Sequence, residues 1–245
     1  MLVSILLNTI DRYELTVKCI GSALATAGFP FELLVCDNGS TDARVAEYTR
    51  SLHPTYFRVN GMNAGIAHMH NQMLLRARGD WFCLLDNDIE IRWNGWLAAM
   101  VNAYERVPLS GIQALYTAGL SPELHPEVEV CGVKIHPAVP PKEDAAFGTR
   151  LFGRKVLEKV GYFCEEYDPY SLADNEYNWR AYHAGFVNYY LGGPECYHLD
   201  LDVGQNTGYR RMKDESMRVA FPKFQANMER YKTTENYYLP PPNEY

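Results

Sequence analysis

Residues 81–88 read WFCLLDND, a short apolar run that ends in two aspartates one residue apart. An apolar run of this length, closed by polar residues, is typical of a buried strand. Side chains at positions i and i+2 of an extended chain point to the same side, so Asp86 and Asp88 can share one divalent ion. A solvated turn around Asn87 explains the same residues, and for a bare D-x-D motif we favour the turn. The residues around the motif have to decide between the two interpretations.

Upstream, the same pattern of an apolar run followed by polar residues occurs at 3–7, 31–36 and 56–59. Segments with helical spacing alternate with these runs, at 14–27, 42–49 and 65–78. This alternation predicts a mostly parallel sheet with helices on both faces. Ligands bind at the carboxyl ends of such strands. The polar residues expected to converge there are Asn8, Thr9, Asp11, Asp37, Asn38, Asn63, Gly65, Asp86, Asn87 and Asp88.

The second half of the chain has a less regular pattern. We expect helices at 96–106, 154–160, 174–184 and 217–231, with Gly185 ending the third of them, and a strand at 186–191. Residues 107–147 are rich in Pro and Gly and predict loops with short, partly antiparallel strands. The polar stretch 197–214 predicts a mobile loop, and the chain ends in a short polyproline-type tail.

Composition limits the classes of partner. The chain has 245 residues with 47% hydrophobic and 22% charged side chains, which is enough for one large α/β domain. A net charge of −7 lowers the odds of a nucleic-acid partner. No apolar run approaches the length of a membrane span, and six scattered cysteines without a CxxC pair predict reduced thiols. We therefore expect a cytoplasmic protein that would meet a membrane only at its surface, if at all.

Taken in order, several segments together resemble one known family. They are VSILLNTIDR, FELLVCDNGSTD, NAGIAHMHNQMLLRARGDWFCLLDND, GYFCEEYDPYSLADNEYNWRAYHAG and CYHLD, which together extend from Val3 to His198. The chain resembles the inverting glycosyltransferases with the GT-A fold, of the family-two type. The resemblance implies a Rossmann-like, mostly parallel sheet flanked by helices, a smaller mixed region for the acceptor, a nucleotide-sugar donor and Mn²⁺ or Mg²⁺.

The resemblance also implies roles for individual residues. Asp86 and Asp88 match the metal-binding pair, His198 matches a late histidine of the metal or diphosphate site, and Asp174 matches the general base. Thr9 and Asp11 match positions that touch the nucleotide, and Asp37 matches the acid that reads the base. The other residues that we assign to donor binding are Arg12, Asn38, Asn63, Gly65, Asn87 and Arg210.

The chain departs from the family pattern around the expected base. Ala173 stands where the family commonly has Glu, and Glu176 is a second acid two positions after Asp174. The two acids compete for the role of base, and the register favours Asp174. Near Arg210, glycines and basic residues favour equally a lid over a diphosphate and a solvated basic turn.

We therefore predict a metal-dependent, inverting transfer of a sugar from a nucleotide diphosphate, most simply UDP, to a hydroxyl of a glycan or another acceptor. One continuous domain would have a donor-binding half at 1–106, an acceptor-side half at 107–216 and a C-terminal helix and tail at 217–245. The alternatives are a non-catalytic sugar- or nucleotide-binding relative and a glycosyltransferase that acts on modified DNA bases. A nucleotidyltransferase is disfavoured because residues 6–16, LLNTIDRYELT, lack the glycine-rich loop of that class.

Overall fold

The computed structural model describes residues 1–115, 126–139, 148–192, 196–199 and 207–242, with the side chains of 207–210 left out. Its centre is a nine-stranded sheet in the order β3-β2-β1-β4-β9-β6-β10-β8-β7. The strands are β1 Val3–Thr9, β2 Phe31–Asp37, β3 Tyr56–Val59, β4 Trp81–Asp86, β6 Ser110–Leu115, β7 Val128–Val130, β8 Val133–Pro137, β9 Arg150–Gly153 and β10 Val187–Leu191.

The first four strands form the parallel half of the sheet, as the sequence predicts. β1 pairs in parallel with both β2 and β4, so that Asn8 lies beside Asp86 and Thr9 lies beside Asp37. Helices α1 (Tyr13–Thr26), α2 (Ala43–Ser51) and α3 (Ile66–Leu74) connect these strands. The polar ends of the strands therefore meet at one edge of the sheet.

The second half extends the same sheet with mixed directions. β9 lies between β4 and β6 and is antiparallel to both, while β6 and β10 are parallel. Two short antiparallel strands, β8 and β7, complete the edge. The expected short, partly antiparallel strands at 107–147 are confirmed where they are described, and residues 116–125 and 140–147 lie outside the described part of that segment.

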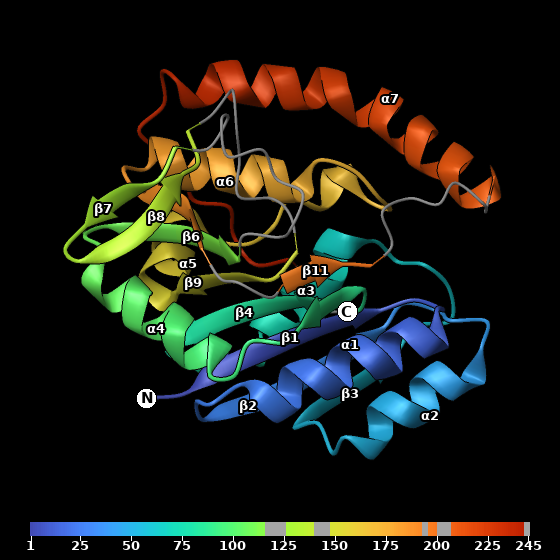
Figure 1. The fold of residues 1–245 in the computed structure, drawn as a ribbon. Helices are drawn as coiled ribbons and strands as arrows, with labels where there is room; N and C mark the ends of the chain where they lie inside the picture. Colours follow the sequence, from blue (N-terminus) through green and yellow to red (C-terminus); the bar gives the residue numbers. More distant parts are fainter. Residues whose placement is uncertain (116–125, 140–147, 193–195, 200–206, 243–245) are drawn as a thin grey trace.

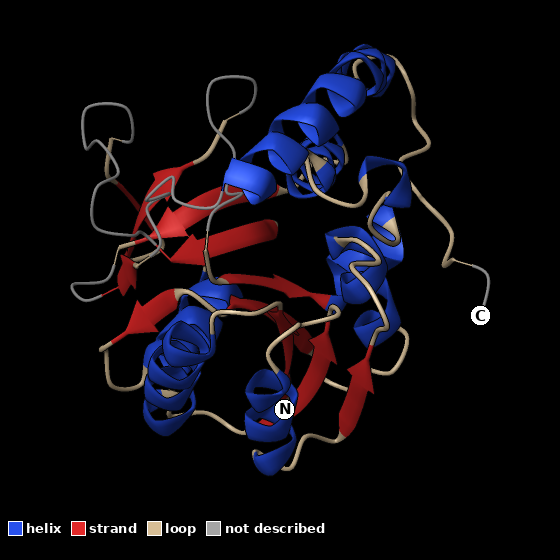
Figure 2. Ribbon diagram, turned by 90° about the vertical axis from the view of Figure 1, so that its right-hand side faces the viewer, coloured by secondary structure: helices blue, strands red, loops and turns tan. Residues whose placement is uncertain are grey.

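Two helical layers bury both faces of the sheet (Figures 1 and 2). Successive residues of each strand alternate between the layers, since Leu6, Phe82 and Leu84 pack on one side while Ile5 and Leu85 pack on the other. The first side is covered by α3 with α5 (Arg154–Val160), α6 (Ala173–His183) and α7 (Thr207–Tyr231), and the second by α1 and α4 (Trp96–Arg106). Burial on both faces explains why the strands are almost continuously apolar.

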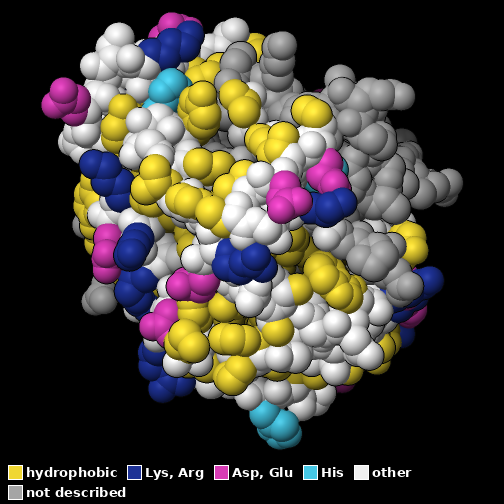
Figure 3. Space-filling model, turned by 60° about the vertical axis from the view of Figure 1, so that its left-hand side comes forward, with side chains coloured by type: hydrophobic (Ala, Val, Ile, Leu, Met, Phe, Trp, Pro, Cys, Tyr) yellow, Lys and Arg dark blue, Asp and Glu magenta, His cyan; other side chains and the backbone are white. Residues whose placement is uncertain are grey.

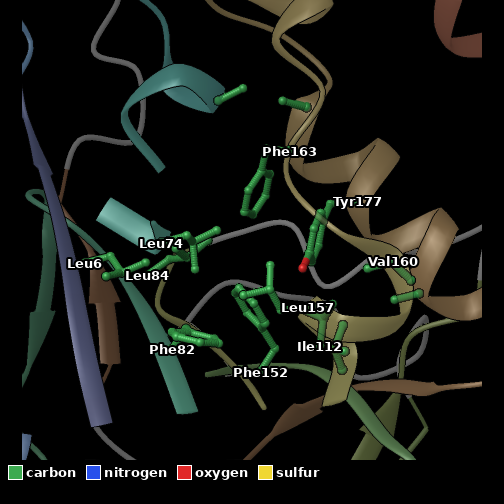
Figure 4. Packing of buried hydrophobic residues seen from close by; sticks show 14 of the residues in the cluster. Leu6, Leu74, Phe82, Leu84, Ile112, Phe152, Leu157, Val160, Phe163 and Tyr177 are labelled. Carbon is green, nitrogen blue, oxygen red and sulfur yellow. The ribbon is translucent and has the colours of Figure 1, made fainter. Parts of the chain in front are cut away.

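Aromatic rings fill the layer between the sheet and α6 (Figure 4). The ring of Phe163 is stacked on that of Tyr177, with centroids 4.1 Å apart, and both rings contact Phe152 of β9. A 3-10 helix, η1 (Glu165–Tyr167), follows Phe163 and leads the chain toward α6. This packing fixes the start of α6 above the carboxyl end of β4.

Two predictions for the C-terminal part were incomplete. The stretch 197–214 was expected to be a mobile loop, but β11 (Cys196–His198) pairs with β5 (Ile89–Ile91) in a second, two-stranded sheet. Helix α7 was expected to begin near 217 and begins at Thr207, with Pro222 inside it. It packs on α6 through buried side chains such as Phe224 and Tyr231.

Candidate active site

A cavity of about 710 Å³ lies at the carboxyl ends of the parallel strands. Its lining comes from segments distant in the sequence: the ends of β1 and β4, the residues before α3, the start of β9, the start of α6, β11 and α7. Of the residues predicted from the sequence, the cavity is lined by Asn8, Thr9, Arg12, Asn38, Asn63, Asp86, Asn87, Asp88, Asp174 and His198.

Asp88 lies between two basic side chains. Arg12 Nη1 is 3.0 Å from Asp88 Oδ2, and His198 Nε2 is 3.3 Å from the same oxygen. The pairing of β11 with β5 accounts for the histidine, because it sets His198 opposite Ile89, directly after Asp88. Leu199 N also donates to the carbonyl oxygen of Asp88, at 2.9 Å.

The two acids of the D-x-D motif differ in their electrostatics. Burial raises the pKa of Asp86 to about 7, although the nearby charge of Arg150 opposes that rise. Burial also disfavours charge on Asp88, but the hydrogen bond from His198 and the charges of His198 and Arg12 outweigh it and lower the pKa. Asp86 is therefore the acid whose charge depends most on a cation in the cavity.

Asp174 lies across the cavity, in the first turn of α6, where the helix dipole favours an acid. Its Oδ1 is 2.7 Å from Nη1 of Arg150, and Nη2 of the same arginine is 3.8 Å from Asp86 Oδ1. Arg150 is buried, with 4% of its side chain exposed. Burial alone would lower the pKa of Arg150, but the charges of Asp174 and Asp86 reverse this effect and raise it.

Glu176, the competing acid, does not line the cavity. It is 1% exposed, and its carboxylate is 2.6 Å from Nε of Arg180 and accepts a hydrogen bond from the hydroxyl of Tyr231. Arg180 in turn donates to the carbonyl oxygens of Val160 and Tyr162. The Glu176–Arg180 pair therefore joins α6 to α5 and α7.

Asp37 and Asp11 make hydrogen bonds within the loops of the strand ends. The carboxylate of Asp37 is fully buried and accepts from the N–H groups of Gly39 and Ser40 and from two hydroxyls, those of Ser40 and Thr9. Asp11 has a positive φ of 50° and accepts from Thr41 and Asp42. Neither carboxylate lines the cavity.

Asn38 and Asn63 line the cavity and bond to each other, since Asn38 Nδ2 donates to Asn63 Oδ1 at 2.7 Å. Asn63 Oδ1 also accepts from Gly65 N. Asn87 is more buried, and its Nδ2 donates to the hydroxyl of Thr16 in α1. These amides therefore join the residue after β2 to the residues before α3, and Asn87 to α1.

The N-terminus of α3 is capped by an acid that the sequence pattern does not reveal. The carboxylate of Asp168 accepts hydrogen bonds from Ala67 N and His68 N, each at 3.0 Å. Burial raises the pKa of Asp168 to about 6 despite these two hydrogen bonds. Gly65 allows this contact, because a Cβ there would lie 2.0 Å from Cγ of Asp168.

Several lining residues were not predicted from the sequence, namely Arg150, Tyr170, Asn175 and Met217. Lys213 of α7 also lines the cavity, with its ammonium 4.7 Å from the ring centroid of Tyr170. The basic cluster at 210–213 is the sequence pattern from which Lys213 could have been predicted to line the cavity. Arg210 itself lies in the first turn of α7, and its side chain is outside the described part of the structure.

The donor set of Asp86, Asp88 and His198 fits a divalent ion such as Mn²⁺. Carboxylate oxygens and an imidazole nitrogen are ligands that this ion accepts, and the three side chains share one cavity. Over the described residues, no three His, Cys, Asp or Glu side chains form a complete metal cage. Ions of this kind are commonly held by one or two carboxylates together with the phosphates of a substrate, so an incomplete cage fits a metal that binds with the donor.

The fold and this acidic cavity define the class of protein, a GT-A-type α/β fold with an acidic cavity at the carboxyl edge of its sheet. Solved structures support the fold. The chain matches TarS of S. aureus in complex with UDP with a TM-score of 0.58 and 19% identity, over 79% of this chain and 61% of that one. A mannosyltransferase of Pyrobaculum calidifontis, in complex with GDP-Man and Mn²⁺, matches with a TM-score of 0.58 and 16% identity, over 92% and 68%.

Within that class, residues 4–123 match the model of Glycosyl transferase family 2, so the resemblance predicted from the motifs is confirmed. A chondroitin synthase of Escherichia coli is 32% identical over 89 residues, which are 36% of this chain and 13% of the synthase. An uncharacterized protein of Sinorhizobium fredii, y4gI, is 24% identical over 80% of this chain and 24% of its own length. The chain thus spans about a quarter or less of the curated relatives it matches.

The matching family model is thus one of glycosyl transferases, and the matching solved structures share its fold. In the part of the chain that the structure describes, no helix combines the length and the apolar character needed to cross a bilayer.

Proposed function

We propose that the chain transfers a sugar from a nucleotide diphosphate, most simply UDP, to a hydroxyl of a glycan or another acceptor, with inversion at the anomeric carbon and with a divalent ion. The observation that carries the proposal is the arrangement of acids in one cavity. Asp86 and Asp88 lie on one side, Asp174 lies on the other, and a buried arginine lies between Asp86 and Asp174.

This arrangement has the parts that an inverting displacement requires. The acceptor oxygen forms a bond to the anomeric carbon while the bond from that carbon to the diphosphate oxygen breaks on the opposite face. Asp174 accepts the proton of the acceptor hydroxyl, and for that it has to lie within hydrogen-bond reach of it. Glu176 is bonded to Arg180 and Tyr231 and does not line the cavity. Of the two acids of α6, Asp174 is therefore the one available as a base.

The leaving diphosphate gains negative charge that has to be balanced. Asp86, Asp88 and His198 would hold a divalent ion, which when bound supplies positive charge to the diphosphate oxygens. Arg12 and Lys213 line the same cavity, and their side chains add positive charge there. For the donor nucleotide, we propose the part of the lining formed by Thr9 at the end of β1, Asn38 directly after β2 and Asn63 before α3.

Calorimetric titration with UDP in the presence and absence of Mn²⁺ tests the donor and the metal together. We expect binding that requires Mn²⁺ and that Asp88→Ala weakens about 10- to 100-fold, the scale on which perturbing a metal site acts. Asp80→Ala is the matched control, because Asp80 is an exposed acid that bonds to Leu2 N outside the cavity. UDP binding that is indifferent to both Mn²⁺ and Asp88 would contradict the proposal. A screen of nucleotide sugars for transfer or hydrolysis then identifies the donor.

Transfer to modified DNA bases remains the second candidate, and the charge distribution disfavours it. The net charge is −7, and on the face seen in Figure 3 the described basic side chains lie among acidic ones instead of forming a continuous basic area. A DNA-binding surface needs clustered Lys and Arg to displace counterions. We expect no retention on DNA at moderate salt, and retention there would favour this candidate.

A further inference from the structure

Arg150 is a buried cation of the cavity to which the proposed reaction has not yet given a role. It begins β9, the strand that runs antiparallel between β4 and β6, and it lies opposite Leu84 and Ala114 in the register. Because side chains alternate along a strand, Leu84 and Asp86 of β4 lie on the same face of the sheet. This register brings the guanidinium to the layer under α6, beside the carboxyl end of β4.

The guanidinium lies between the two sides of the proposed site. It contacts Asp174 at 2.7 Å and approaches Asp86 to 3.8 Å, with only 4% of the side chain exposed. Arg150 is therefore the side chain that connects the proposed base to the proposed metal side of the cavity.

The contact also distinguishes the two oxygens of Asp174. Oδ1, the atom that faces Arg150, is buried, whereas 18% of the Asp174 side chain is exposed. Oδ2 is therefore the oxygen left to face the cavity. The printed contact joins one nitrogen of the planar guanidinium to Oδ1, and a lysine ammonium, which is a point charge on a flexible stem, would not reproduce that geometry. One oxygen of Asp174 is thus turned inward to Arg150.

We infer that Arg150 is a positioning residue, which fixes the carboxylate of Asp174 so that Oδ2 meets the acceptor hydroxyl. This inference rests on the proposed function. It places the acceptor hydroxyl within about 2.6–3.2 Å of a single oxygen atom, the reach that proton transfer to a base requires. It also gives a role to the buried arginine, which lies next to Asp174 while the donor would bring its negative charge to the side of Asp86 and Asp88.

Kinetics of Arg150 variants test the inference. UDP release from UDP-GlcNAc with Mn²⁺ is measured with the best acceptor found, or with water. Arg150→Met should lower kcat about 100-fold, the lower end of what a positioned base contributes, while the KM for UDP-GlcNAc changes little. Arg150→Lys should restore only part of kcat, because it returns the charge without the planar geometry. Arg154→Met is the control, since Arg154 bonds to Gly79 O outside the cavity, and it should keep the kcat of the wild type.

The outcomes separate the inference from the function on which it rests. A wild type that turns over UDP-GlcNAc, with an Arg150→Met variant of equal kcat, would overturn the inference alone. A variant with a raised KM and an unchanged kcat would also overturn it, since Arg150 would then act on the donor. If Arg150→Met does not fold, Arg150→Lys decides by the same split between kcat and KM. A wild type that turns over no nucleotide sugar would overturn the proposed function, and the inference with it.

Discussion

Two acids of α6, Asp174 and Glu176, lie two positions apart and have opposite surroundings. Asp174 lines the cavity beside Arg150, whereas Glu176 is 1% exposed and paired with Arg180. Two positions along a helix rotate the side chain by about 200°, so neighbouring acids of this kind cannot share a site. Because of this rotation, Asp174 faces the cavity and Glu176 faces the neighbouring helices.

Conservative substitutions should separate these roles. Asp174→Asn should fold and bind UDP as the wild type does, but should lose sugar transfer by about 100-fold or more. Glu176→Gln should instead destabilise the fold by about 3–5 kcal/mol, because it leaves the buried charge of Arg180 without its partner. Urea unfolding and a transfer assay on both variants measure this. Loss of transfer in a fully folded Glu176→Gln, with transfer kept in Asp174→Asn, would exchange the two assignments.

His70 of α3 predicts a pH dependence of stability. Its ring is 1% exposed and lies 4.9 Å from that of Phe163, and burial lowers the pKa of the imidazole to about 4. The unfolded chain, with a pKa near 6.5, binds the proton more readily. The contribution of His70 to the free energy of unfolding should therefore be complete above pH 6.5. Below that pH, the free energy of unfolding should fall by about 1.4 kcal/mol per pH unit toward pH 4.

His70→Gln should remove that slope, as urea unfolding at several pH values would reveal. The raised pKa of Asp168, about 6, acts in the opposite direction, since the folded state then binds its proton more readily and stability falls as the pH rises from 4 to 6. The wild type and His70→Gln share this second effect, so the difference between their pH profiles reports on His70 alone. Parallel curves for the two chains would contradict the prediction.

At the scale of elements, the segment from Phe163 to the start of α6 is bonded to α3. Asp168 caps the first turn of α3, Glu165 contacts His68 and Asn71 of the same helix, and Asn71 exchanges two hydrogen bonds with Phe163. The segment carries Tyr170 and leads into Asp174, both of which line the cavity. Direct contacts with α3 therefore hold the segment that carries these two cavity residues in place.

Gly65→Ala should break this connection. Gly65 has a φ of +104°, and an added Cβ would lie 2.0 Å from Asp168 Cγ, so the variant meets both backbone strain and a clash with the cap. We expect a loss of about 2–4 kcal/mol in urea unfolding, from strain and the lost cap together. Gly185→Ala is the matched control, because its φ is +93° but a Cβ there meets nothing within 4 Å. Equal losses in the two variants would show that the contact with Asp168 adds nothing.

At the scale of the whole molecule, one sheet runs through both predicted halves. β9 joins β4 to β6, and β11 returns to β5, so that the cavity draws its lining from the first strand through to α7. The division at residue 106 into donor and acceptor halves stays a prediction. A ligand in this cavity would contact elements from the entire chain and should stabilise all of it.

Thermal unfolding should therefore respond to donor and metal together. UDP with Mn²⁺ at about 100 times the dissociation constant should add about 2.7 kcal/mol to the free energy of unfolding, because the ligand binds only the folded chain. EDTA should abolish the effect of UDP, and Asp88→Ala should reduce it in the same way. Stabilisation by UDP that survives EDTA would argue against a shared site for metal and nucleotide.

Local patterns predicted much of the fold and part of the site. The helices at 96–106 and 154–160 and the strand at 56–59 have the predicted bounds. Asp42, the first residue of the segment predicted at 42–49, is the N-cap of α2. Asp86 and Asp88 were found because they follow an apolar run, whereas Asp174 was found through the resemblance to the family. Arg150 and Asp168 could not be found in this way. One begins a four-residue strand after a Pro-rich stretch, and the other caps a helix about a hundred residues earlier in the chain.

The sequence by itself determined the alternation of strands and helices, the buried parallel sheet and the acids at its carboxyl edge. These follow from hydrophobic periodicity and from polar residues that end each run, which are local properties. Only the tertiary structure decided which side chains meet across the cavity: Arg150 with Asp174 and Asp86, His198 with Asp88, and Asp168 with α3. Those contacts depend on strand order and on the register of β9 and β11, and both are set by packing between segments far apart in the chain.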